Sequence, residues 1–188
     1  MTDATALTPG EIAKIAARID RPVVLVGLMG VGKSTVGRRL AAMLGTDFVD
    51  VDDEIERAAD RTVSEIFEAH GEAYFRAGER RVIARLMEEA HGVIATGGGA
   101  FVDPETRALI LDQAIAVWLD CDIDTLVERT SRRNDRPLLR NGSAREILTD
   151  LKDRRGAAYA EAQIHLVTDN GPHSETAQRI LEAIDAWL

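Results

Sequence analysis

Short apolar runs rich in β-branched residues alternate along this chain with longer segments in which apolar residues recur every three or four positions. The short runs are Val23–Val26, Phe48–Val51, Val93–Thr96, Ala114–Leu119 and Ile164–Val167. Runs of this kind are typical of buried strands, and strands that alternate with helices predict a parallel sheet covered on both faces. We therefore expect an α/β protein with three layers, α/β/α.

The longer segments have the apolar spacing of amphipathic helices. They are Lys33–Leu44, Glu72–Ala90, Pro104–Leu111, Ile123–Arg129, Ala144–Glu161 and Ser174–Leu188. A chain of 188 residues is large enough for one hydrophobic core. We expect a single domain over residues 1–188.

Residues 1–20 predict a helical extension that lies outside the alternating pattern. The segment Thr8–Glu11 reads TPGE, which matches a capping box with Pro at the first helical position. Ile12, Ile15 and Ile19 follow at helical spacing. We expect this helix to pack on the surface of the domain.

Composition excludes several classes of protein. The net charge of −9 makes general attraction to nucleic acid or to an anionic membrane unfavourable, so we expect neither partner. No segment has the 18 or more apolar residues of a membrane span, and the first twenty residues lack the pattern of a signal peptide. We expect a cytoplasmic protein, and the short length favours a monomer. The single Cys121 predicts a buried thiol beside a strand end.

The strongest chemical motif is Gly27–Ser34, which reads GLMGVGKS and matches G-x-x-x-x-G-K-[ST]. It follows the run Val23–Val26 and opens a helical segment, as the motif requires. Glycines let backbone N–H groups surround phosphate oxygens, Lys33 would reach the β- and γ-phosphates, and Ser34 would ligate Mg²⁺. A glycine-rich turn is the alternative, and we interpret the motif as a nucleotide-phosphate site.

Two carboxylates follow the second apolar run. Asp50 and Asp52 lie two positions apart, and on an extended strand such residues face the same side. At the carboxyl edge of a parallel sheet, one could hold Mg²⁺ through water while the other accepts a hydroxyl proton. The alternative is that Asp52 caps the next helix, because Asp-Asp-Glu at 52–54 is also a helix-start pattern.

Three consecutive glycines, Gly97–Gly99, follow the run Val93–Thr96. They form either a strained turn or a wall that a ligand approaches closely, and we favour the wall. Spacing alone does not single out Arg76 or Arg155, since each could be an ordinary surface arginine on a helix.

Residues 131–143 are rich in Arg, Asn, Pro and Gly and predict a lid. Nine Lys or Arg against four Asp or Glu lie from Arg129 to Arg155, within an otherwise acidic chain. A solvated helix face explains part of this excess, but a basic loop also suits closure over a polyphosphate. Arg136 is the lid candidate, because arginine stabilises charge on a transferring phosphoryl group.

An ordered set of motifs resembles the shikimate kinases from Val23 to Leu188. The set consists of Gly27–Gly37 with Leu40-Ala41, Asp50-Val51-Asp52, Phe75-Arg76 with Glu79, Gly97–Gly99, Arg136–Leu139, and Arg155 with Tyr159. The resemblance implies a nucleoside-monophosphate-kinase-like P-loop fold with a five-stranded parallel sheet of order 2-3-1-4-5. It also implies transfer of phosphate from ATP to the 3-hydroxyl of shikimate, which gives shikimate 3-phosphate and ADP on the way to chorismate and the aromatic amino acids.

The resemblance further implies a role for each matched residue. Asp52 would bind the shikimate hydroxyl and act as base, with Lys33 and Arg136 as the other catalytic residues. Residues that would hold the nucleotide are Gly30, Val31, Gly32, Lys33, Ser34, Thr35, Arg129 (stacked on adenine) and Arg136. Residues that would hold shikimate are Asp52, Arg76, Gly97, Gly98, Gly99 and Arg155, with Glu79 steadying Arg76. Ser34 and Asp50 would serve the Mg²⁺ ion.

Two other functions remain open at this point. One is a kinase on the same scaffold for another small acceptor such as gluconate, from which the pair Arg76 and Arg155 would distinguish this chain. The other is a regulatory nucleotide-binding module without catalysis, which typically loses the lysine or the base. A loose transition state would not require a raised pKa at Asp52.

Overall fold

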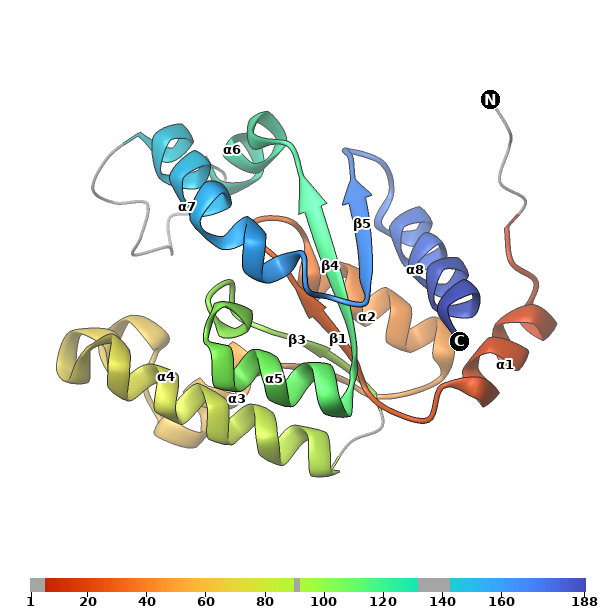
Figure 1. Cartoon of the computed structure of the whole chain (residues 1–188), viewed down its shortest axis with the longest axis horizontal. Coiled ribbons are helices and arrows are strands. Elements are labelled where there is room, and N and C mark those ends of the chain that lie inside the picture. Colours follow the sequence, from red (N-terminus) through yellow and green to blue (C-terminus); the bar gives the residue numbers. More distant parts are fainter. Residues whose placement is uncertain (1–5, 90–91, 132–142) are drawn as a thin grey trace.

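The structure is a computed structural model that describes residues 6–89, 92–131 and 143–188. Five parallel strands form its central sheet in the order β2-β3-β1-β4-β5 (Figure 1). The strands are β1 (Val23–Val26), β2 (Phe48–Asp50), β3 (Val93–Ala95), β4 (Ile115–Cys121) and β5 (Ile164–Thr168). The expected sheet and its order are confirmed.

Helices cover both faces of the sheet. They are α1 (Pro9–Arg18), α2 (Lys33–Leu44), α3 (Val51–Ala59), α4 (Val63–Glu89), the short 3₁₀ helix η1 (Ala100–Val102), α5 (Pro104–Gln113), α6 (Ile123–Ser131), α7 (Ala144–Tyr159) and α8 (His173–Trp187). Helices α2 and α8 pack together on one face, while α5 and α7 lie on the other (Figure 1). The three-layer arrangement is therefore the expected one.

The register of the sheet gathers the chemical motifs at one edge. Leu25 pairs with Ala95, and Ala95 pairs with Asp50, so three strands end in one row. Strands β1 and β3 are wholly buried because they lie in the interior of the sheet. Because the strands are parallel, the segments that follow them emerge side by side at their carboxyl ends, which is where ligands bind in open α/β sheets.

Helix α2 sits close to the sheet because Gly37 has no side chain. A Cβ at Gly37 would lie 2.5 Å from the Phe48 ring and 3.3 Å from the Leu25 side chain. The helix ends at Gly45, whose left-handed conformation (φ 67°) and backbone N–H close the last turn. The phosphate motif is thus joined to a helix held firmly against β1.

The N-terminal helix has the predicted capping box. The Thr8 N–H donates to the Glu11 carboxylate at 2.7 Å, and the Glu11 N–H donates to the Thr8 hydroxyl at 3.3 Å. Ile15 is buried, and Arg18 pairs with Asp185 of α8. Helix α1 therefore packs on the domain beside α2 and α8.

Two helices differ from the sequence expectation. Helix α3 is absent from the expected helical segments and entered only as the helix that Asp52 would cap, and α4 begins at Val63 rather than at Glu72. Helix α4 consists of two helical halves joined at Gly71, whose φ of 77° and ψ of 175° are not helical. A second capping box starts its first half, since the Thr62 N–H donates to the Glu65 carboxylate at 2.7 Å and the Glu65 N–H returns to the Thr62 hydroxyl at 3.2 Å.

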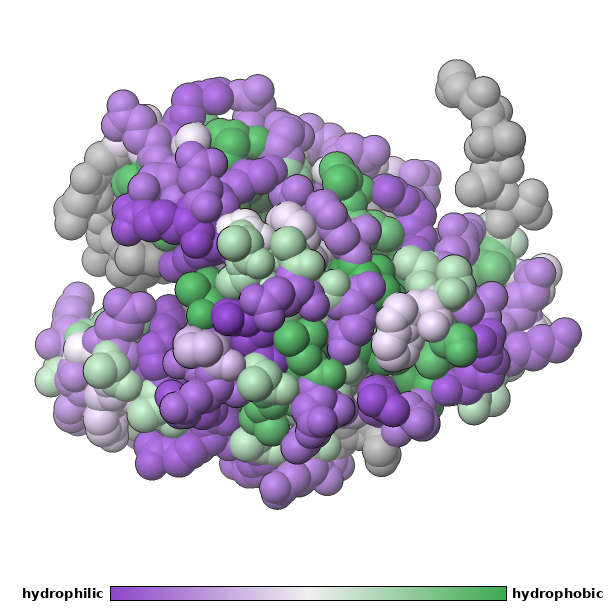
Figure 2. Space-filling model, in the orientation of Figure 1, coloured by the Kyte–Doolittle hydropathy of each residue, from purple (hydrophilic) through white to green (hydrophobic). Residues whose placement is uncertain are grey.

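The surface is mostly hydrophilic on the face drawn in Figure 2, where apolar residues appear in small areas among charged ones. Cys121 is buried at the end of β4, as expected. Within the described ranges, no helix is both long and apolar enough to cross a membrane.

Candidate active site

The phosphate loop, Gly27–Ser34, connects β1 to α2. Gly27, Gly30 and Gly32 have φ values of 138°, 84° and 101°, which side chains rarely adopt. A Cβ at Gly27 would also collide with the Leu119 carbonyl oxygen on the neighbouring β4. The loop therefore depends on these glycines, and it leads directly into the N-terminus of α2, the end of a helix that favours anions.

Lys33 is the first residue of α2, and its side chain is only 8% exposed. Its ammonium donates to the carbonyl oxygens of Gly27 at 2.8 Å and Leu28 at 2.9 Å. These bonds hold a dehydrated positive charge against the loop. Val31 is buried in the loop, and Thr35 is exposed in the first turn of α2.

Ser34 and Asp50 are in direct contact, although they are 16 residues apart. The Ser34 hydroxyl donates to Asp50 Oδ2 at 2.5 Å. The other oxygen, Asp50 Oδ1, accepts the backbone N–H of Asp52 at 3.1 Å and so caps α3. The two residues expected to serve Mg²⁺ are thus brought together.

Asp52 does not lie on a strand, so that part of the prediction is wrong. Strand β2 ends at Asp50, and Asp52 lies in the first turn of α3. The alternative placed the helix cap two residues too late, since Asp50 rather than Asp52 caps the helix. Because α3 starts at Val51, strand β2 is only three residues long. The carboxylates of Asp50 and Asp52 still lie close enough for their charges to interact.

The pKa of Asp52 is raised to about 6. Burial is the largest cause, because it disfavours the charged carboxylate, and the nearby charge of Asp50 adds to it. Lys33 and Arg76 act in the opposite direction. The structure therefore gives Asp52 the basicity of a group that gains and loses a proton near neutral pH.

The three glycines of the Gly97–Gly99 loop leave space that side chains of other residues occupy. A Cβ at Gly97 would lie 3.0 Å from Asp52 Oδ1 and 3.0 Å from Glu79 Oε1. A Cβ at Gly98 would lie 3.3 Å from Arg155 Nη1, and one at Gly99 would collide with the Arg76 guanidinium. The loop is therefore a backbone wall against which a carboxylate base and two guanidinium groups are packed.

Arg76 is fixed by two carboxylates on its own helix. Its Nη1 contacts Glu79 Oε2 at 2.5 Å, and its Nη2 contacts Glu72 Oε1 at 3.4 Å. The guanidinium carbon also lies 5.2 Å from the centre of the Phe75 ring. Glu79 is buried and Arg76 faces the glycine wall, so Arg76 is not a surface arginine.

Glu79 is 1% exposed and uses one oxygen for Arg76. Among the described residues its other oxygen, Oε1, has no hydrogen-bond partner. Burial raises the pKa of this carboxyl, while Arg76 opposes the rise. A buried acceptor oxygen beside Gly97 is suited to bind a hydroxyl group.

On the other side of the wall, α7 supplies Arg155 and Tyr159. Arg155 Nη1 faces Gly98, as given above, and Tyr159 is 1% exposed. The Tyr159 hydroxyl donates to the Gly98 carbonyl oxygen. Arg76 and Arg155 therefore reach the same loop from different helices.

Arg129 connects the phosphate loop to the segment after β5. Its guanidinium donates to the Val31 carbonyl oxygen at 3.2 Å and to the Asp169 carbonyl oxygen at 2.7 Å. His173, at the start of α8, lies beside Gly32, and burial together with the charges of Arg129 and Arg39 lowers the pKa of its imidazole. Arg136 lies outside the described residues, as do 132–142 of the expected lid.

Sequence reasoning gave no role of their own to three side chains at this site. The motifs include Tyr159 without a role, assign Glu79 only to Arg76 and leave out His173. The burial of Tyr159 and Glu79 depends on contacts between helices, which a linear pattern does not show. The spacing of Tyr159 four residues after Arg155 was the one available signal.

Comparison with known proteins bears directly on this site. A family model described as shikimate kinase matches residues 29–185. A shikimate kinase of Novosphingobium aromaticivorans is 60% identical over 99% of this chain and 98% of its own length. A shikimate kinase of Caulobacter vibrioides is 55% identical over 87% of this chain and 82% of its own length.

A solved structure is similar over the same region. Shikimate kinase from Acinetobacter baumannii in complex with shikimate matches with a TM-score of 0.87 and 38% identity, covering 92% of this chain and 97% of that one. The family model, the relatives and the order of the motifs agree, and the chain therefore belongs to the shikimate kinase family.

Proposed function

We propose that this chain transfers the γ-phosphoryl group of ATP to the 3-hydroxyl of shikimate, giving shikimate 3-phosphate and ADP. Membership of the family supports the reaction type. The observation that carries the assignment is the Gly97–Gly99 wall, which Asp52, Arg76 and Arg155 approach from three helices. A base and two guanidinium groups around a wall without side chains suit a small cyclic carboxylate with a reactive hydroxyl.

The acceptor binds through opposite charge and hydrogen bonds. Arg76 and Arg155 clamp the carboxylate, which planar guanidinium groups bind well in pairs. Gly97–Gly99 let the ring approach the backbone closely. The oxygen Oε1 of Glu79 accepts a hydroxyl of the ring, which gives that buried atom the partner it lacks among the described residues.

The donor site holds the phosphates and a Mg²⁺ ion. Residues that contact the nucleotide are Gly30, Val31, Gly32, Lys33, Ser34, Thr35 and Arg129. The adjacent hydroxyl of Ser34 and carboxylate of Asp50 are hard oxygen donors, which fit Mg²⁺. The described residues contain no cluster of three or more metal-binding side chains, and Ser34 and Asp50 are the residues that would hold the ion. Mg²⁺ supplies charge neutralisation at the phosphates.

In the chemical step the acceptor oxygen attacks the γ-phosphorus in line with the leaving oxygen of ADP. The bond from acceptor oxygen to phosphorus forms, the bond from phosphorus to the β-bridging oxygen breaks, and the hydroxyl proton passes to the Asp52 carboxylate. Lys33 offsets negative charge at the β- and γ-phosphates. The catalytic role of Arg136 stays a prediction from its motif. A monomer in the cytoplasm, supplying a step toward the aromatic amino acids, is part of the same proposal.

The experiment that tests the proposal is coupled ADP release by the purified protein with MgATP. Shikimate is compared with gluconate and quinate, and Asp52→Asn is compared with Asp53→Asn. Asp53 is an adjacent carboxylate whose side chain is 71% exposed, and it lies 3.8 Å from Arg38 rather than in the site. We expect release that depends on shikimate, is abolished by Asp52→Asn and is retained by Asp53→Asn.

Other outcomes discriminate between the alternatives. Release stimulated by gluconate would keep the fold and replace the acceptor. Binding of ADP without stimulation by any acceptor would favour a regulatory nucleotide-binding module.

A further inference from the structure

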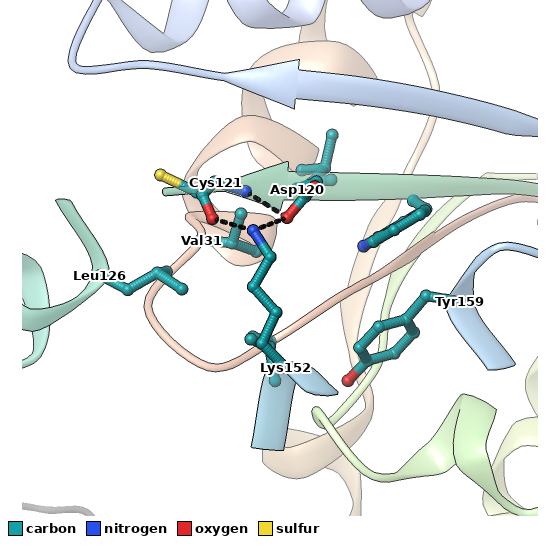
Figure 3. Close-up of a pocket in the computed structure, with 9 residues that line it drawn as sticks. Val31, Asp120, Cys121, Leu126, Lys152 and Tyr159 are labelled. Carbon is teal, nitrogen blue, oxygen red and sulfur yellow. Dashed lines mark hydrogen bonds and ion pairs between the residues drawn. The ribbon is translucent and has the colours of Figure 1, made fainter. Parts of the chain in front are cut away.

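Three side chains on one face of α7 point toward the sheet. Lys152, Arg155 and Tyr159 are spaced by three and four residues, so they lie on one side of the helix. Figure 3 shows Lys152 reaching from α7 to Asp120 and Cys121 at the end of β4, while the Tyr159 hydroxyl points away from that strand. Arg155 lies between them in the sequence and faces the glycine wall.

The Tyr159 hydroxyl makes one polar contact at the acceptor site and lies beside a second group. It donates to the Gly98 carbonyl oxygen, and the charged Arg155 side chain is near enough to act on its pKa. Burial raises the pKa of this phenol, so the hydroxyl keeps its proton and remains a donor to Gly98. Its lone pairs suit the neighbouring Arg155, since a guanidinium only donates.

The ring of Tyr159 is held by packing rather than left to rotate. Its centre lies 5.8 Å from that of Trp118 on β4. Trp118 in turn stacks on His165 of β5, with ring centres 3.8 Å apart and planes 9° from parallel. The position of the hydroxyl is therefore fixed relative to two strands of the sheet.

Lys152 fixes α7 at a second point, about two turns away. Its ammonium lies 2.8 Å from Asp120 Oδ1 and donates to the Cys121 carbonyl oxygen at 2.8 Å (Figure 3). Both acceptors lie at the carboxyl end of β4. Helix α7 is thus attached to the sheet on both sides of Arg155.

Gly98 is the place where these restraints meet the phosphate loop. A Cβ at Gly98 would lie 3.3 Å from Arg155 Nη1 and 3.4 Å from the backbone nitrogen of Met29. The carbonyl of Gly98 that Tyr159 holds thus belongs to a residue packed between Arg155 and the donor loop. A long guanidinium side chain loses conformational freedom when it is ordered, so holding it in advance favours binding of its ligand.

We propose that Tyr159 is the positioning residue of the acceptor site, which aligns the Arg155 guanidinium with the Gly98 backbone before the carboxylate binds. This inference rests on the proposed function in taking Arg155 as a carboxylate ligand. Tyr159 acts through Arg155 and Gly98 and does not touch the reacting atoms.

The first test is Tyr159→Phe, which keeps the ring and removes only the hydroxyl. We expect the KM for shikimate to rise about tenfold, the value of one hydrogen bond, with the KM for ATP unchanged. The matched control is Tyr74→Phe, which removes the same group from a tyrosine that is 55% exposed and packs against His70. It should leave the KM for shikimate within about twofold.

The decisive test is a double-mutant cycle with Arg155→Lys. If Tyr159 acts through Arg155, Tyr159→Phe should change the KM for shikimate less than about twofold in the Arg155→Lys background. Equal effects in both backgrounds, or a rise in the KM for ATP, would overturn the inference. If Tyr159→Phe folds poorly, Lys152→Met is the second variant, because it removes the other attachment of α7 to the sheet. The KM for shikimate should rise in this variant, and an unchanged KM would count against the inference.

The same cycle separates the inference from the proposed function. An unchanged KM for shikimate in Arg155→Lys alone would refute the carboxylate clamp. A raised KM in Arg155→Lys with no change in Tyr159→Phe would refute only the positioning role.

Discussion

Each residue of Gly97–Gly99 has a different neighbour at the place where its β-carbon would lie. The neighbours are Asp52 and Glu79 for Gly97, Arg155 for Gly98 and Arg76 for Gly99. Gly99 has a φ of −97°, which any residue adopts, so here the loop needs glycine for space and not for backbone freedom. A single methyl group is therefore a local probe of each catalytic or binding side chain.

Gly99→Ala should displace the Arg76 guanidinium, since the added carbon would overlap it. We expect the KM for shikimate to rise by at least about tenfold, because a charge-assisted bond to the carboxylate weakens, with little change in the KM for ATP. Steady-state kinetics measure both. Gly156→Ala is the control, because a Cβ there meets nothing within 4 Å although it is next to Arg155 in sequence. A KM equal to that of the unmodified protein would contradict the placement of Arg76.

The raised pKa of Asp52 predicts an acid limit of activity. Below pH 6 the carboxylate is increasingly protonated and cannot accept the hydroxyl proton, so kcat/KM for shikimate should fall as the pH drops through about 6. A pH profile of kcat/KM with shikimate varied measures it. A profile that stays level well below pH 6 would show that Asp52 is not the base or is not buried as described.

The same pKa shift has the opposite consequence for stability. Because the folded pKa lies above the unfolded value of 3.8, the native state binds more protons between the two values, and stability declines as the pH rises through this window. Asp52→Asn should therefore increase the free energy of unfolding at pH 7, on the order of 2 kcal/mol, while it abolishes turnover. Denaturant titrations at pH 7 and near pH 4 measure the effect, which should shrink at the lower pH. A destabilised variant at pH 7 would be the contrary result.

Among single residues, the sequence predicts those site residues that lie close together along the chain. The phosphate loop and the three glycines are each contiguous, and they follow β1 and β3 directly. The partnership of Glu79 with Gly97, and of Tyr159 with Gly98, joins residues 18 and 61 positions apart in sequence. Such pairs depend on how helices pack, so the pattern of one chain does not reveal them.

At the scale of elements, α4 consists of a short and a longer helix that meet at Gly71. The first half carries Ile66 and Phe67, and the second carries Arg76 and Glu79. The conformation of Gly71, with φ 77° and ψ 175°, belongs to a region that is essentially restricted to glycine. The angle at which the second half presents Arg76 to the glycine wall therefore depends on this residue.

Gly71→Ala should lower the free energy of unfolding by about 1–3 kcal/mol, because alanine adopts this conformation only with strain. Chemical denaturation measures the change. Gly78→Ala in the same helix is the control: its Cβ meets nothing within 4 Å, and we expect a gain of up to about 1 kcal/mol from the better helix propensity. Equal effects of the two substitutions would mean that the kink carries no strain.

Helix boundaries explain why α3 was missing from the expectation. Strand β2 ends at Asp50 and α3 begins at the next residue, Val51. Because Val51 is apolar, it extends the pattern of the strand across this boundary. The Asp50 side chain decides the outcome by capping α3. The first half of α4 is eight residues from Val63 to His70, too short for a clear helical period despite its capping box.

At the scale of the whole molecule, α1 closes one side of the core. Ile15 is 4% exposed and belongs to the main hydrophobic cluster, while Ile12 only packs against its margin. The site lies at the carboxyl ends of β1, β2 and β3 and includes none of these residues. The sheet order was expected from the resemblance to a family, since the alternation of elements alone predicts only a parallel sheet.

Ile15→Ala should reduce the free energy of unfolding by about 2–4 kcal/mol, because it leaves a cavity between α1 and the domain. We expect the KM for both substrates to stay the same. Thermal and denaturant unfolding, together with steady-state kinetics, check this, and Ile12→Ala should cost clearly less. A changed KM for either substrate would mean that α1 communicates with the site.

The Asp50 carboxylate contacts two helices with different oxygen atoms. Oδ2 accepts from Ser34 at the start of α2, and Oδ1 holds the first turn of α3, on which Asp52 stands. Under the proposed function, this one carboxylate lies between the nucleotide and the acceptor. Any coupling that it carries must be reciprocal, so that each ligand changes the affinity for the other by the same factor.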